Sequence, residues 1–297
     1  MTWLTDPFAA EFMQRALWAG MLAVLASSVV GTWVVLRGLT FLGDALAHGV
    51  IPGMALAVLW GFNLTLGALL TAGLMVGGIT FVNRRARLAE DTGVGLLFVG
   101  MLALGVIIIS KSRSFATDVQ SLLFGDVLGV TWADLRVQAV AAVLVVVVSV
   151  LGYRPFLTLS FNEVKAGSLG LRPGLTHLVL LGLIAVAIVS SFQAVGTLLV
   201  FGLLVGPPAT AALLVRRVWL NMVVAVGLGW LAVVVGLVVS YQWGTAAGAT
   251  MAGVSVALFF AVLLTQELVA LLRPAPVSAR GVQEPVAWPP RQPRGSE

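Results

Sequence analysis

Apolar runs long enough to cross a membrane occupy most of this chain. A transmembrane α-helix needs about 20 predominantly apolar residues. Nine runs of roughly this length follow one another, at residues 15–36, 44–60, 64–82, 92–110, 135–153, 175–190, 195–215, 219–240 and 249–272. Because the bilayer core offers no water to backbone N–H and C=O groups, spanning segments of this length are helices. The sequence therefore predicts an all-α polytopic integral membrane protein with eight or nine transmembrane helices.

Composition supports the same class. Hydrophobic residues make up 60% of the chain, charged residues make up 10%, and the mean hydropathy is +1.06, whereas soluble domains carry about 25% charged residues. The net charge of +5 does not indicate a nucleic-acid partner, because the basic residues are scattered between apolar runs. The chain contains no cysteine, so a metal ion would meet oxygen, nitrogen or thioether ligands and no thiolate.

The distribution of basic residues predicts the topology. The apolar run 119–130 is too short to cross a membrane and is interpreted as a re-entrant or surface helix. With that assignment, thirteen of the 17 basic residues lie on one side: Arg37, Arg84, Arg85, Arg87, Arg154, Lys165, Arg172, Arg216, Arg217, Arg273, Arg280, Arg291 and Arg294. Cytoplasmic loops are enriched in Lys and Arg, so we expect the N-terminus outside and the C-terminus in the cytoplasm.

The C-terminal segment 273–297 differs from the rest of the chain, because prolines interrupt it at six positions. A proline-rich segment that buries little apolar surface remains disordered. We therefore expect residues 273–297 to form a disordered cytoplasmic tail and residues 1–272 to form a single transmembrane domain.

Asp44 and His48 are ionisable residues at the start of the second apolar run. A carboxylate near a bilayer centre costs about 2.5–3.5 kcal/mol on insertion scales, so such residues are functional candidates. Their i, i+4 spacing places both on one helix face, where they offer an oxygen and a nitrogen ligand to a divalent metal. The alternative is structural: Asp44 caps the helix by accepting from the N–H of Leu46 or Ala47, and His48 bonds a neighbouring helix. The residues alone leave both interpretations open.

The chain lacks a phosphate-binding loop, since its only lysines, Lys111 and Lys165, do not follow the required glycines. It therefore does not hydrolyse ATP through that motif. The loop 154–174 contains the sequence FNEVKAGSLGL at 161–171, which predicts a short cytoplasmic helix capped by Asn162 and suited to docking in a groove of another protein. The alternative is a solvated connector without a partner.

Four stretches resemble the zinc/manganese-type permease family of bacterial ABC importers. They are RGLTFLGDALAHGVIPG at 37–53, DVQSLLFGD at 118–126, the loop around 161–171, and GTLLVFGLLVGPPATA at 196–211. The resemblance covers about residues 12–272. It departs from the family pattern at Asn162, where members often carry an acid, and at 244–248, which lacks the usual acid and proline.

The resemblance implies a permease subunit, not an enzyme, in a bacterial inner membrane. It implies a homodimer, a separate dimeric ATPase and an extracytoplasmic metal-binding protein, with a divalent metal as cargo and no permanently bound cofactor. Zinc is the expected metal, followed by manganese and iron. The implied ATPase-coupling residues are Asn162, Glu163, Lys165, Gly167, Leu169 and Gly170. Asp44 and His48 become the expected metal path, and Asp118 and Asp126 are outer-side candidates that otherwise cap short helices.

Other functions stay open. In a proton-coupled secondary transporter, Asp44 and His48 would carry protons and no ATPase would be present. An ABC permease for a chelated metal is a further alternative. Elsewhere, Arg37 is interpreted as a lipid-phosphate anchor at the cytoplasmic end of the first run, and His177 is assigned a structural role.

Overall fold

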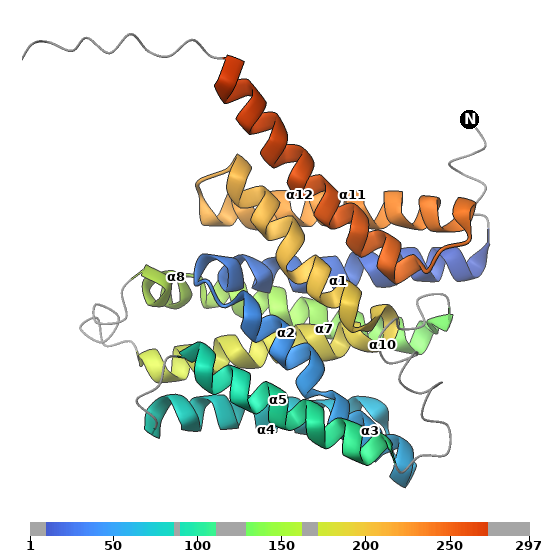
Figure 1. Cartoon of the computed structure of the whole chain (residues 1–297), viewed down its shortest axis with the longest axis vertical. Helices are drawn as coiled ribbons and strands as arrows, with labels where there is room; N and C mark the ends of the chain where they lie inside the picture. The colour runs from blue at the N-terminus through green and yellow to red at the C-terminus, as the bar shows by residue number, and fades with distance from the viewer. Residues whose placement is uncertain (1–9, 86–89, 111–128, 162–171, 273–297) are drawn as a thin grey trace, which may run out of the picture.

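The structure, a computed structural model, describes residues 10–85, 90–110, 129–161 and 172–272 (Figure 1). These residues form ten helices and no strand. The helices are α1 (Glu11–Leu36), α2 (Thr40–Gly49), α3 (Ile51–Trp60), α4 (Leu64–Arg85), α5 (Glu90–Ile109), α7 (Trp132–Leu151), α8 (Tyr153–Phe161), α10 (Pro173–Leu214), α11 (Val218–Trp243) and α12 (Ala247–Leu272). The predicted all-α class is therefore confirmed.

Eight segments are long and apolar enough to cross a membrane, counted over the described residues. They correspond to the predicted runs with one exception. The run predicted at 195–215 forms the second part of α10, in which the apolar helix Leu199–Leu214 is shorter than the other spans. The protein is therefore a multi-pass membrane protein, and its described residues contain eight helical segments long enough to span and one shorter apolar helix.

The direction of α10 changes at Gly196. Its backbone has φ 76° and ψ 164°, a conformation that is accessible to glycine and strained for other residues. The parts of α10 before and after this residue run in different directions (Figure 1). One glycine therefore converts a single long apolar segment into one full span and one shorter helix.

Pro207 and Pro208 lie inside the second part of α10 and lack the N–H groups that would bond the carbonyls of Leu203 and Leu204. Gly31 of α1 lies so close to the Leu204 carbonyl that a Cβ built on it would overlap that oxygen. The absence of a side chain at Gly31 thus lets α1 cover a carbonyl that its own helix leaves without a donor.

A buried polar network holds the same region. Thr32 Oγ1 donates to Asn221 Oδ1 at 3.1 Å, and Asn221 Nδ2 donates to the carbonyl of Pro208 at 3.4 Å. These bonds join α1, α10 and α11 inside an otherwise apolar core. Because an unpaired buried polar group is costly, the network fixes how these three helices pack.

The helix ends alternate between two ends of the bundle (Figure 1). The end of α1, α8, the first turn of α10 and the turn between α10 and α11 lie together at the left in that view, and the start of α7 lies at the right. This is the alternation that the sequence predicts, with Arg37 and Arg216 at the same end. The assignment of that end to the cytoplasm stays a prediction.

Three predicted features lie outside the described residues. They are the greater part of the short run 119–130, the coupling helix within 162–171, and the tail 273–297. Their structures stay predictions.

Candidate metal-binding site

α2 carries Asp44 and His48 on the one face that the bundle leaves half open. The opposite face is buried by Leu42, Ala45 and Leu46. Phe41, Asp44 and His48 are spaced by three and four residues, so they form a stripe along the open side. In this arrangement the apolar residues of α2 other than Phe41 pack into the core, and its two ionisable residues avoid full burial.

The two side chains are close without forming a tight bond. His48 Nε2 lies 3.5 Å from Asp44 Oδ1, with exposed fractions of 24% for His48 and 33% for Asp44. A distance of 3.5 Å exceeds that of a good charge-assisted hydrogen bond. The carboxylate and imidazole therefore face each other with both groups still able to bind a third partner.

The His48 ring packs edge-on against Phe98 of α5, with ring centroids 5.9 Å apart. Its Nδ1 atom is buried and has no hydrogen-bond partner among the described residues. The ring is thus oriented by an apolar contact, and the predicted hydrogen bond from His48 to a neighbouring helix is absent from the described part of the chain.

The prediction that Asp44 caps the second helix is wrong. α2 begins at Thr40, its N-cap is Leu39, and no side chain makes a capping hydrogen bond there. The predicted start at Asp44 was one turn too late, because a glycine turn at Gly38, with φ 68°, ends α1 and lets the next helix start earlier. Asp44 lies inside the helix, one turn before His48, whose Nε2 atom is 3.5 Å from Asp44 Oδ1.

The described residues of one chain supply only part of a metal site. No group of three or more His, Cys, Asp and Glu residues comes together within the described ranges. Divalent cations take four or more ligands from protein and water, and the pair offers one oxygen and one nitrogen donor. Any metal bound here would complete its coordination with water or with groups from outside the described residues of this chain.

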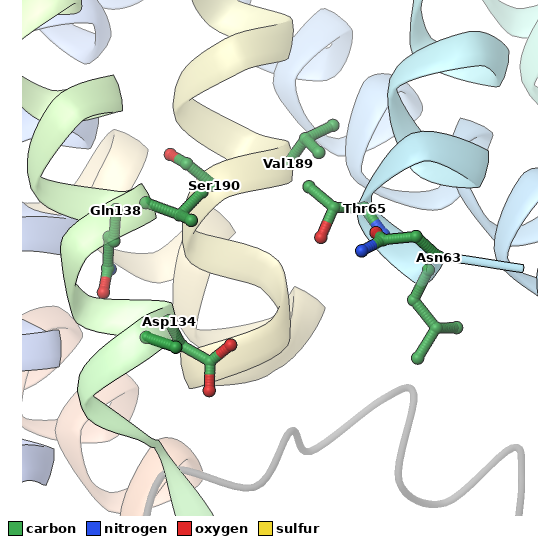
Figure 2. Close-up of a pocket in the computed structure, with 9 residues that line it drawn as sticks. Asn63, Thr65, Asp134, Gln138, Val189 and Ser190 are labelled. Atoms are coloured by element: carbon green, nitrogen blue, oxygen red, sulfur yellow. The ribbon is translucent and has the colours of Figure 1, made fainter.

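A separate polar pocket of about 340 Å³ lies between the start of α4, the start of α7 and α10. Figure 2 shows Asn63 and Thr65 on one side of it, and Asp134 and Ser190 on the other. Two of these groups already serve as helix caps: Asn63 Oδ1 accepts from the N–H of Thr65, and Asp134 forms a capping box with Thr131. The pocket was not predicted, because no sequence pattern connects residues of α4 with residues of α7.

The other predicted site residues lie outside the described part of the chain. They are Asp118, Asp126, Asn162, Glu163, Lys165, Gly167, Leu169 and Gly170. The structure also shows a contact that was not predicted. Arg37 Nη1 lies 3.0 Å from His177 Nδ1, although the two residues are 140 positions apart in the sequence. No pattern in the sequence signals that contact.

Residues 9–266 match the ABC 3 transport family. The chain is 36% identical to the manganese transport system membrane protein MntC of Listeria monocytogenes, over 89% of this chain and 94% of that protein. It is 32% identical to a probable iron transport system membrane protein of Haemophilus influenzae, over 86% of this chain and 94% of that one.

A solved structure shares this architecture. The structure of PsaBC from Streptococcus pneumoniae in complex with Fab superposes with a TM-score of 0.80 and 28% sequence identity, over 91% of this chain and 99% of the other. The similarity thus extends over nearly the whole length of both chains.

Proposed function

Because the chain belongs to the ABC 3 transport family, it is a membrane permease subunit of an ABC transporter for divalent metal import, and we propose that it carries manganese. The main support for manganese is the 36% identity to a manganese transport protein over 89% of the chain. The sequence favoured zinc, for which these relatives give no support. Ferrous iron ranks second, because a relative named for iron is 32% identical.

The chemistry of the pair on α2 agrees with this choice. Asp44 offers a hard carboxylate oxygen and His48 a borderline imidazole nitrogen, and the chain has no thiolate to favour softer metals. A cation between them would replace the long 3.5 Å contact with two metal–ligand bonds. The metal would also offset the cost of holding a carboxylate inside the membrane.

We propose that two copies of the chain place their pairs opposite each other. Each pair lies on a half-open helix face, where a second chain could approach. Two chains related by a twofold axis would supply two carboxylates and two imidazoles, which is enough for a transient site on the transport path. The remaining predicted partners complete the proposal: an ATPase at the basic end of the bundle and an extracytoplasmic metal-binding protein at the other.

The experiment uses the full chain, purified with its ATPase and reconstituted in proteoliposomes, with Mn²⁺, Fe²⁺ and Zn²⁺ as competing cargo. We expect ATP-dependent uptake with preference for Mn²⁺. The variants Asp44→Asn and His48→Ala should each lower uptake at least about tenfold, as expected when a metal site loses a ligand, and both should still bind the ATPase.

Asp134→Asn is the matched control, because it alters a half-exposed acid at the other end of the bundle. Uptake that follows a proton gradient and ignores ATP would favour the secondary-transporter alternative. Undiminished uptake in both α2 variants would exclude the pair from the path.

A further inference from the structure

Both helices that flank the segment 162–171 contact the last turn of α1. On the N-terminal flank, α8 contacts it through aromatic rings: Trp33 lies edge-on to Tyr153 and Phe156, at centroid distances of 5.6 and 5.7 Å. Trp33 has an exposed fraction of 0%, so this contact is fully packed. The end of α1 is therefore fixed to the helix that precedes the predicted coupling segment.

On the C-terminal flank, α10 contacts Arg37, the residue that directly follows α1, through a hydrogen bond. Arg37 Nη1 and His177 Nδ1 are 3.0 Å apart, and both side chains are half buried. A guanidinium has only donors, so Nδ1 is the acceptor and the neutral ring carries its proton on Nε2. This bond is charge-assisted and directional, which makes it stronger than an ordinary neutral hydrogen bond.

The turn that follows Arg37 is closed by two backbone hydrogen bonds. The N–H of Leu39 donates to the carbonyl of Val34 at 2.9 Å, and the N–H of Gly38 donates to the carbonyl of Val35 at 3.1 Å. With Gly38 at φ 68°, these bonds form a Schellman motif. α2 begins one residue after Leu39, and its second turn carries Asp44. The end of α1 is thus connected to the Asp44–His48 pair through a short hydrogen-bonded turn and one turn of helix.

We propose that the Arg37–His177 hydrogen bond is a positioning contact that transmits movement of the start of α10 to the Asp44–His48 pair on α2. This inference rests on the proposed function, since it requires an ATPase that acts on the segment before α10. Arg37 and His177 touch no metal in this role. Their role is to couple movement of the Asp44–His48 pair to ATP hydrolysis by the partner subunit.

The test separates the hydrogen bond from the packing of the ring. His177→Phe keeps a ring and removes the acceptor, whereas His177→Asn keeps an acceptor oxygen near the position of Nδ1 and removes the ring. Arg37→Gln removes the charge-assisted donor, and Arg216→Gln, at an exposed arginine of the same end, is its control. The readout is Mn²⁺ transported per ATP hydrolysed, by the full complex in proteoliposomes, for equal amounts of folded protein.

We expect His177→Phe and Arg37→Gln each to lower the ratio of Mn²⁺ to ATP about tenfold, as expected for a lost charge-assisted hydrogen bond. The double variant should be no worse than either single variant, because both remove the same interaction. His177→Asn and Arg216→Gln should keep a ratio within about twofold of the wild-type value.

A normal ratio in His177→Phe together with a low ratio in His177→Asn would overturn the inference, since the ring and not the acceptor would then matter. A normal ratio in every variant would overturn it as well. Failure of the proposed function would look different, because the wild-type protein itself would then show no ATP-dependent uptake.

Discussion

Replacement of Gly31 by alanine should destabilise the protein through one identified contact. A Cβ at this position would overlap the carbonyl oxygen of Leu204 and would lie 3.0 Å from Pro208 Cγ. The oxygen belongs to backbone, which cannot rotate away as the end of a side chain could. Relief of the overlap requires α1 and the second part of α10 to separate, which also strains the bond from Thr32 to Asn221.

The size of the effect follows from a matched substitution. Overpacking of this kind costs about 1–3 kcal/mol, whereas Gly→Ala in an unobstructed helix stabilises by about 0.5–1 kcal/mol. Apart from its own helix backbone, no atom of the described residues lies within 4 Å of a Cβ built on Gly182 in α10, so Gly182→Ala is the control. We expect the unfolding free energies of the two variants to differ by about 1.5–4 kcal/mol, with Gly31→Ala the less stable.

The assay is equilibrium unfolding of the full chain in mixed micelles, followed by circular dichroism and by tryptophan fluorescence. Equal stability of Gly31→Ala and Gly182→Ala would refute the close approach of α1 to Leu204.

Two further substitutions test other parts of the packing. Gln138 has an exposed fraction of 1%, donates to the carbonyl of Ala19 at 3.0 Å, and has an Oε1 atom without a partner in the described ranges. Gln138→Met removes one bond and one unpaired acceptor together, so its unfolding free energy should stay within about 1 kcal/mol of the wild-type value; a larger loss in chemical unfolding would mean that Oε1 is bonded. Gly38→Ala meets no atom within 4 Å and is opposed only by its φ of 68°, so it should cost about 1–2 kcal/mol, with a smaller loss for Gly38→Asn. Thermal unfolding that ranks asparagine below alanine would contradict the Schellman turn.

The membrane spans could be predicted because hydrophobic length is a local property. The boundaries were less accurate where backbone geometry decides them. Asp44 resembles a capping residue at the start of an apolar run, yet the helix starts at Thr40 because Gly38 ends α1 so tightly. The two runs expected on either side of Gly196 correspond to the two parts of α10, and the single positive φ at Gly196 separates them.

The Asp44–His48 pair could be predicted because its i, i+4 spacing is local too, and the structure confirms that both side chains share a face. Contacts between distant helices could not. Arg37 and His177, and likewise Thr32 and Asn221, meet only because of how α1, α10 and α11 pack. Helix packing in membranes is decided by shape and small residues, and a single sequence carries little information about which faces meet.

The Asp44–His48 pair is the centre of the proposed transport path, and electron spin-echo spectroscopy of bound Mn²⁺ tests it most directly. The full complex, loaded with Mn²⁺ in detergent, should show coupling to imidazole nitrogen. That coupling should disappear in His48→Ala, and Mn²⁺ should bind more weakly in Asp44→Asn. Bound Mn²⁺ with no nitrogen coupling, or with coupling that persists in His48→Ala, would contradict the assignment.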